Sequence, residues 1–419
     1  MGQSPQELTP VGPAPAQGRW SPLRDGRFRR FWAGGTISMT CYWMIEASCA
    51  WEMRVLSGAD PLLVSLVTST LQFTVMLAVM PAGVIADIVD RRRLIVASHA
   101  WLGIVVAMVC ALLAAGWLTP GRLLAFLPAI ALAQAIRMPV IGSSLVDTVE
   151  RGALPAAVAL NALGQNAARI VGPAAAGLLL GVGGASLGLA VAVAGLLLAG
   201  AALASVPFER RRPHVPLTAR SFLEDARAER AFLASTRWKR NLLLRAGGFF
   251  ACASAIPALL PVVFGSGTVY GAMLALYGAG AVAGLLVIGR PRSDHASERR
   301  ALVAQSMHGA GLVLLGTAGD GVGAAAALLV CGAAWLALSN SLMTAAQLQL
   351  PAESRARGLS VVYAVGMAGL AAGGPVWGWV ARQFGTGAGF VAAGACSLLL
   401  VGLTFRREFT LGGSRRGPV

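Results

Sequence analysis

Several charged residues stand inside long apolar runs, where each charge costs about 2.5–3.5 kcal/mol to insert at the centre of a bilayer. Glu46, Arg137 and Arg169 are the most deeply placed. At a rise of about 1.5 Å per residue from the ends of their runs, they fall near the middle of a membrane. A carboxylate there can exchange a proton, and an arginine can hold an anionic group. We therefore expect Glu46 to couple protons and to pair with Arg137 or Arg169, with a static ion pair as the alternative.

Other charged groups in apolar runs have simpler expected roles. Glu52 and Arg54 fall near one surface and are expected to form an interfacial pair or an outer gate. Arg245 lies near a helix end, from which its side chain can reach the membrane surface. His308 is expected to be a packed, hydrogen-bonded histidine, with proton relay as the less favoured interpretation.

Aromatic and hydrogen-bonding residues accompany these charges and are candidates to line a substrate cavity. Tyr42 and Trp43 flank Glu46 at helical spacing. The second half of the chain offers a lining with few charges, which suits a fairly large amphipathic solute. Its candidates are Phe249, Phe250, Trp335 and Asn340. Pro257 and Pro261 should bend the helix that carries the two phenylalanines.

The composition indicates a membrane protein. Hydrophobic residues make up 56% of the chain and charged residues 12%, and the mean hydropathy is +0.68. The net charge of +16 lies in short gaps between apolar runs, which argues against nucleic-acid binding. The six cysteines all fall in apolar runs without metal-ligand spacing, so we expect neither disulfides nor a metal site. No nucleotide-binding, hydrolase or metalloprotease motif occurs, so an enzyme and a cofactor are not expected, and an ion gradient is the expected energy source.

Hydropathy predicts an all-α membrane protein with twelve spans in two bundles of six. The predicted order is a cytoplasmic tail (1–30), a first bundle (31–206), a cytoplasmic segment with an amphipathic helix (207–240), a second bundle (241–405) and a cytoplasmic tail (406–419). The predicted spans are 31–55, 61–86, 94–117, 122–147, 157–182, 185–206, 241–265, 268–289, 301–319, 322–347, 358–381 and 386–405.

The distribution of arginine predicts the orientation. Most arginines fall in alternate loops and both tails, which places both termini in the cytoplasm of a plasma membrane, the inner membrane of a bacterium. The two halves also repeat, because AVALNALGQNAARIVGP aligns with LSVVYAVGMAGLAAGGP and brings Gly172-Pro173 onto Gly374-Pro375. Two parallel repeats are typical of one large class of secondary transporter.

The stretch PAGVIADIVDRRR, residues 81–93, links the second and third spans and resembles the loop between helices 2 and 3 of the major facilitator superfamily. NAARIVGPAAAG, LLLRAGGFF, YGAMLALYGAGAVAG and RARGLSVVYAVGMAGLAAGGPVWGW extend the resemblance over nearly the whole chain. Together they are similar to the branch that contains the enterobactin exporter and macrolide-efflux-like proteins. The resemblance implies a monomeric transporter of two six-helix bundles that acts on a small organic molecule.

The resemblance also implies roles for single residues. Asp87 would meet the start of the eleventh span at Gly358 and form a gate with Arg91 and Arg92, while Gly83 would allow close helix packing and Asp90 would cap the third span. The departures from the family pattern are Ile88, where a basic residue is usual, and Asp90, where glycine is usual.

GQNAARIVGPAAAG resembles the helix-5 motif of exporters, so Gly172, Pro173, Gly374 and Pro375 are predicted hinges between the bundles. These features favour proton-coupled export of a siderophore-like metabolite or drug. The alternatives are an uptake permease and a non-pumping membrane protein, such as a lipid scramblase or a scaffold.

Overall fold

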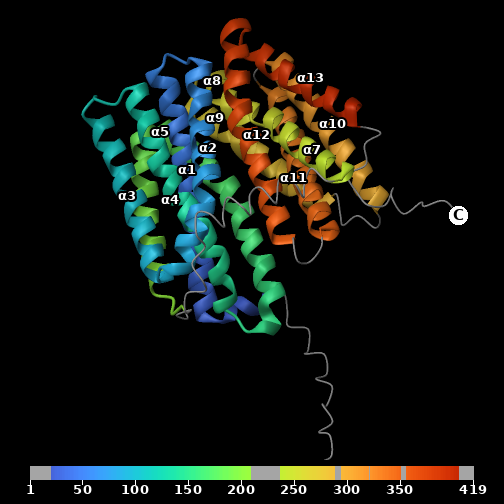
Figure 1. The fold of residues 1–419 in the computed structure, drawn as a ribbon. Coiled ribbons are helices and arrows are strands. Elements are labelled where there is room, and N and C mark those ends of the chain that lie inside the picture. Colours follow the sequence, from blue (N-terminus) through green and yellow to red (C-terminus); the bar gives the residue numbers. More distant parts are fainter. Residues whose placement is uncertain (1–19, 209–235, 288–293, 320, 351–354, 405–419) are drawn as a thin grey trace, which may run out of the picture.

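The computed structural model describes residues 20–208, 236–287, 294–319, 321–350 and 355–404, and within these ranges the chain forms helices and no strand. Much of the predicted cytoplasmic segment, residues 1–19 of the predicted N-terminal tail, the C-terminal tail and the side chains of Asp87, Ile88 and Arg357 lie outside the described part. Figure 1 shows the helices as two groups, with the first half of the sequence in blue to green and the second in yellow to red.

Four of the five helices of the first bundle begin at a polar cap, while α5 follows Ala153 without one. Asp25, Asp60 and Asp90 accept a hydrogen bond from a backbone N–H of the helix that follows, and Thr119 does the same. The helices are α1 (Gly26–Leu56), α2 (Pro61–Ile88), α3 (Arg91–Ala114), α4 (Pro120–Ser144) and α5 (Leu154–Ala204). Short 3-10 turns lie at Ser21–Arg24, Leu145–Asp147 and Arg151–Ala153. The capping role predicted for Asp90 is confirmed, since its Oδ1 accepts from the Arg93 N–H at 3.0 Å.

α5 holds two membrane spans. Its dihedral angles leave the helical region at Gly183 and Gly184, and Gly184 has a φ of 67° that favours glycine. A straight helix of 51 residues would extend well beyond the thickness of a bilayer. The break at Gly183 and Gly184 is therefore the point at which the chain reverses direction.

The second bundle also consists of consecutive helices joined by short connections. Its helices are α7 (Arg237–Ala253), α8 (Ala255–Val263), α9 (Gly267–Val287), α10 (Asp294–Ala318), α11 (Val322–Gln349), α12 (Arg355–Phe384) and α13 (Thr386–Thr404). The predicted bend in the seventh span is present as the break between α7 and α8 at Ser254. Pro257 accounts for it, since it lacks the N–H that would bond the carbonyl of Ala253.

Ten helices in the described ranges are long and apolar enough to cross a membrane. This count already takes α7 and α8 as one span, so splitting α5 in two and adding the more polar α1 gives the twelve predicted spans, and their order agrees with the prediction. Large apolar side chains such as Leu77, Ile104 and Val182 are 58%, 62% and 85% exposed, as expected for residues that face lipid.

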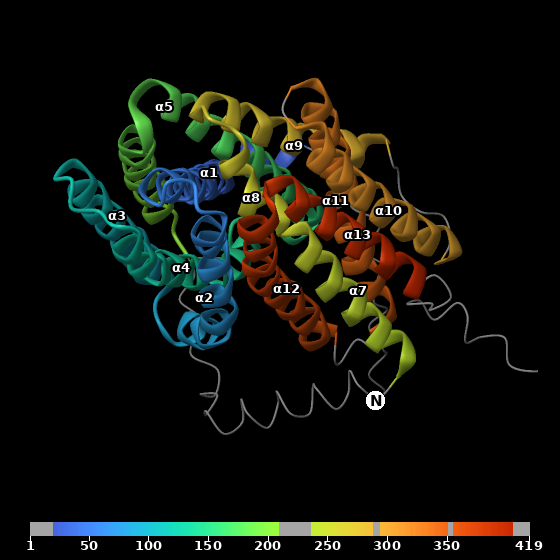
Figure 2. The same ribbon diagram turned by 90° about the horizontal axis from the view of Figure 1, so that it is seen from above.

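The bundles pack most closely at one end. We call the side on which α1 ends and α2 begins the outer side, and the side on which α2 ends and α3 begins the inner side. Gly177 and Gly181 of α5 contact Gly271 and Thr268 of α9 so closely that a Cβ at either α5 position would clash. Gly374 and Gly378 of α12 make equivalent contacts with Ser69 and Ser65 of α2. All of these contacts lie toward the outer side, where Figures 1 and 2 show the two groups of helices side by side.

Candidate functional site

Arg169 on α5 lies between tryptophans from the two bundles. Its guanidinium carbon is 5.1 Å from the ring centre of Trp43 on α1 and 4.6 Å from that of Trp335 on α11. Both distances are within the range of cation–π attraction, which strengthens when the cation is removed from water. Arg169 therefore contacts both bundles through cation–π interactions with the two tryptophans.

Two glycines bring the partners of Arg169 into place. A Cβ at Gly172, one turn after Arg169, would lie 2.6 Å from the carbonyl oxygen of Thr40 and 2.7 Å from the Cβ of Trp43. The absence of a side chain at Gly172 thus lets α1 approach α5 at Trp43. On the other bundle, a Cβ at Gly278 of α9 would lie 2.6 Å from Cγ1 of Ile170, so this glycine brings α9 against α5.

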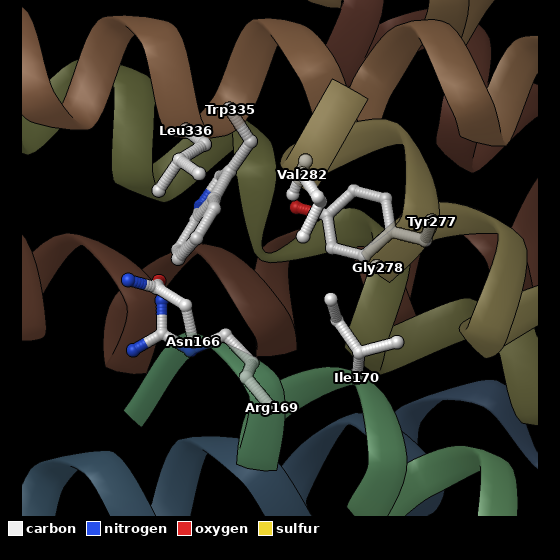
Figure 3. Close-up of a pocket in the computed structure, with 9 residues that line it drawn as sticks. Asn166, Arg169, Ile170, Tyr277, Gly278, Val282, Trp335 and Leu336 are labelled. Carbon is white, nitrogen blue, oxygen red and sulfur yellow. The ribbon is translucent and has the colours of Figure 1, made fainter. Parts of the chain in front are cut away.

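A small pocket of about 30 Å³ opens beside Arg169. Figure 3 shows Arg169 and Asn166 extending from α5 toward Trp335, while the Tyr277 hydroxyl points into the space from the other side. Apart from these polar groups, the pocket is lined by apolar side chains and the tryptophan ring. The lining residues are Asn166, Arg169, Ile170, Tyr277, Gly278, Ala281, Val282, Trp335 and Leu336.

Glu46 is buried in α1 with one carboxylate oxygen unused. The Thr68 hydroxyl of α2 donates to Oε1 at 3.3 Å, and Oε2 has no hydrogen-bond partner among the described residues. No ion pair within 4 Å joins Glu46 to Arg137 or Arg169 in the described part of the chain, so the predicted contact pair is absent. Glu46 and Arg169 still interact electrostatically across the space between α1 and α5.

Arg137 on α4 is 2% exposed and belongs to a separate polar group inside the first bundle. Its Nη2 donates to Oε1 of Gln134 at 2.6 Å, while Nε and Nη1 lack a partner among the described residues. Tyr42 and Cys41 are within its electrostatic range. Arg137 is therefore placed to interact with α1 one turn away from Glu46, but it does not line the pocket at Arg169.

Only some of the other predicted lining residues lie at the pocket. Tyr42 packs edge-on against Trp43 at 5.9 Å, and Phe250 packs edge-on against Trp335 at 6.5 Å, so both support the site. Phe249 is fully buried within the second bundle against His308, with 5.1 Å between the ring centres. Asn340 is exposed and lies outside the pocket.

Tyr277 and Asn166 were missed as site residues, although both lie in stretches that carry the family resemblance. Thr68 and Gln134, which hold Glu46 and Arg137, were also missed. The available signal was the presence of hydrogen-bonding side chains within apolar runs, but such residues are common in packed membrane helices.

The outer side carries a second inter-bundle contact. Trp51 of α1 stacks on Tyr270 of α9 with 5.7 Å between ring centres, and the Arg54 guanidinium lies 4.8 Å from the Trp51 ring. Arg54 forms no ion pair with Glu52 in the described part of the chain, so it stacks instead of forming the predicted pair. Asp60 and Arg382 form an ion pair at 3.6 Å between α2 and α12 on the same side.

On the inner side, the predicted gate residues are only partly assembled. Arg91 pairs with Asp147, which follows α4, and this contact lies within the first bundle. No described atom lies within 4 Å of a Cβ at Gly83, so the close helix contact predicted at this glycine is absent. Gly358 packs against Leu350 of its own bundle. The side chain of Asp87, the central residue of the predicted gate, lies outside the described residues.

The predicted hinge glycines face different neighbours. Gly374 of α12 contacts α2 across the bundles, whereas Gly172 faces α1 of its own bundle. Pro173 and Pro375 both lie within helices, in α5 and α12. At the α5–α9 interface, Gly177 and Gly181 make the cross-bundle contacts that were predicted for the Gly172-Pro173 pair.

Two helical bundles with apolar outer surfaces and polar groups between them define a membrane transporter of the major facilitator type. The family comparison then places the chain: residues 17–412 match the model described as "Transmembrane secretion effector", and the protein belongs to this family. A comparison with curated proteins finds no match.

Solved transporters share the fold at low sequence identity. The nucleoside transporter NupG has a TM-score of 0.71 at 13% identity, over 91% of this chain and 98% of that one. A bacterial homologue of the human lysosomal transporter Spinster, inward-facing and occupied, has 0.73 at 14%, over 95% and 99%. The human organic anion transporter MFSD10 has 0.62 at 16%, over 90% and 99%. The cargoes named for two of them, nucleosides and organic anions, differ, so the shared fold does not identify a substrate.

Proposed function

We propose that this protein is a proton-coupled exporter that moves a small organic molecule out of the cell by alternating access. The observation that carries the proposal is Glu46, a carboxylate buried among membrane helices with one oxygen free of described partners. A charge kept at this depth despite its insertion cost is expected to have a function. The family description, which names secretion, supports the outward direction.

In the proposed cycle, Glu46 and Arg169 respond to one another through their charges. When Glu46 is ionised, its negative charge offsets part of the positive charge of Arg169. When Glu46 takes up a proton, Arg169 loses that compensation and attracts an anionic or zwitterionic substrate more strongly. Arg137 on α4 contributes a second positive charge to the first bundle. It lies near Tyr42, which is about one helical turn from Glu46 on α1.

Alternating access would come from rocking of the bundles around this site. The excess of arginine on the inner side supports a cytoplasmic position for that side and for both termini, in the plasma membrane or the bacterial inner membrane. We further propose that the inner gate closes when Asp87, with Arg91 and Arg92 beside it, approaches the start of α12 at Gly358. Closure would also bring Gly83 of α2 into contact with a neighbouring helix. We propose that the chain works as a monomer in the lipid bilayer.

The role of Glu46 is tested by Glu46→Gln in reconstituted vesicles. The amide cannot cycle a proton, so we expect pH-gradient-driven transport to be abolished while gradient-free substrate exchange persists. Transport is followed with a radiolabelled substrate under gradients imposed in either direction. The control is Glu52→Gln, a similarly buried carboxyl group near the outer side, which should retain driven transport.

Three outcomes would contradict parts of this proposal. Driven transport in Glu46→Gln at the wild-type rate would remove the coupling role. Accumulation in the direction of the proton gradient would indicate an uptake permease. Transport by the wild-type protein that ignores the gradient altogether would indicate a non-pumping protein.

A further inference from the structure

The charges around the centre of the first bundle do not balance. Two arginines, Arg137 and Arg169, are set against one carboxylate, Glu46, and no ion pair within 4 Å joins them in the described part of the chain. Even with Glu46 ionised, one positive charge is left over in a region poor in water. An anionic ligand would restore neutrality where a cation would add to the imbalance.

The position of the uncompensated positive charge narrows the class of ligand that the site could bind. Among the described residues, Arg169 is the only charged one that lines the pocket, and its Nε has no hydrogen-bond partner there. Asn166 and the Tyr277 hydroxyl are the other polar groups of the lining, and Figure 3 shows Asn166 beside Arg169 and Tyr277 on the opposite side of the pocket. One N–H of the Asn166 amide already donates to the Ala162 carbonyl oxygen at 2.9 Å, so its second N–H is the one available to a ligand. These donors can hold one acceptor group, such as a carboxylate, beside the guanidinium.

The remaining walls are aromatic and apolar. Trp335 is surrounded by other rings, with Phe250 at 6.5 Å and Tyr277 at 6.4 Å between ring centres. The planar guanidinium of Arg169 occupies the space between Trp335 and Trp43. A flat aromatic ring fits the same place as the guanidinium, because it too gains from stacking on an indole face.

Building on the proposed function, we propose that the site between Trp43 and Trp335 binds a planar aromatic anion, with its acidic group on Arg169 and its ring against Trp335. The pocket of about 30 Å³ has room for only a few water molecules. The ring therefore enters when Arg169 turns out of the space between the tryptophans to meet the acidic group. Because the tryptophans belong to different bundles, a bound ring contacts both of them.

The test measures binding of tritiated 1-naphthoate to the purified full-length protein, with three unlabelled competitors. 1-Naphthamide has the ring without the charge, cyclohexanecarboxylate has the charge without the aromatic ring, and 1-naphthylmethylammonium reverses the charge. We expect unlabelled 1-naphthoate to compete best. Each of the other three should be weaker by roughly tenfold or more, because each loses either the charge-assisted contact or the stacking.

Substitutions connect binding to the named residues. Arg169→Gln should weaken 1-naphthoate binding by roughly tenfold or more, and Arg169→Lys should weaken it less, since lysine keeps the charge but loses the planar fork. Trp335→Leu should weaken binding roughly two- to tenfold. The matched control is Trp379→Leu on α12, where the indole is 53% exposed outside the pocket and binding should be unchanged.

The results separate this proposal from the transport mechanism. Equal competition by 1-naphthamide, or unchanged binding in both Arg169 variants, would overturn the aromatic-anion site even if Glu46→Gln abolishes driven transport. Conversely, 1-naphthoate binding that depends on Arg169 supports the site even if Glu46 has no coupling role. Failure of wild-type protein to bind 1-naphthoate at millimolar concentration would also overturn it.

Discussion

At the residue scale, Gly172 helps to position the site. It has no Cβ at the point where α1 crosses α5, and this lets Trp43 come within reach of Arg169. A hinge was predicted here from the Gly-Pro pair. The contacts instead support a positioning role for Gly172, because its close neighbours are the backbone of Thr40 and the Cβ of Trp43.

Gly172→Ala should therefore destabilise the protein and move Trp43. The new methyl group would lie 2.6–2.7 Å from its neighbours, and overpacking of this kind costs about 1–3 kcal/mol. Thermal unfolding in detergent measures the stability, and Trp43 fluorescence in a variant without the other tryptophans measures its environment. Gly103→Ala on α3 is the control, because nothing lies within 4 Å of its added Cβ. Equal melting temperatures for both variants would contradict the close contact.

At the element scale, the bundles meet through pairs of helices without large side chains between them. α5 packs on α9 at Gly177 and Gly181, and α2 packs on α12 at Gly374 and Gly378. Such backbone contact is favoured between membrane helices because lipid supplies no hydrophobic drive for association. Contacts of this kind depend on shape, so they can separate and reform as the bundles move.

A disulfide between α5 and α9 tests this interface. A Cβ at Gly181 would lie 3.2 Å from the Cβ of Thr268, slightly below the range of about 3.5–4.5 Å found in disulfides, so after a small shift of either helix the double variant Gly181→Cys, Thr268→Cys should crosslink on mild oxidation. We expect the crosslink to hold the outer side closed and to stop transport, with recovery on reduction. The single variants are controls for the substitutions alone. Transport that continues through a fully crosslinked protein would show that these helices need not separate.

At the scale of the whole molecule, the closest described cross-bundle contacts lie on the outer side, while Tyr363 of α12 donates to Sδ of Met138 on α4 at 3.6 Å nearer the inner ends of these helices. Trp51 stacks on Tyr270 there, and Asp60 pairs with Arg382. Gly83, near the inner side, has no close described neighbour. This arrangement is that of a transporter closed on the outer side, and Arg169 lies between the outer contacts and the inner end of α5.

Pairs of spin labels can follow the opposite movement of the two sides. Exposed positions suit the labels: Val89 and Leu348 on the inner side, and Trp117 and Val322 on the outer side. If the bundles rock, conditions that shorten the inner distance should lengthen the outer one, as measured by double electron–electron resonance with and without 1-naphthoate. Changes in the same direction at both sides would contradict rocking.

Asp87→Asn should favour the longer inner distance if Asp87 closes the proposed gate.

The sequence alone determined the class of fold, the twelve spans and the residues whose charges are buried. These properties are local, because twenty or so apolar residues identify a span and a charge within it has a depth set by helical rise. The bend at the seventh span and the Asp90 cap were predictable for the same reason.

Only the tertiary structure decided which buried groups meet. Depth along a helix does not give the direction of a side chain, which depends on how each helix is rotated against its neighbours. Glu46 and Arg169 have similar depths, yet Arg169 lies between Trp43 and Trp335 and forms no contact pair with Glu46. Packing at glycines selects that rotation, so the partners of Arg169 came from helices far apart in the chain.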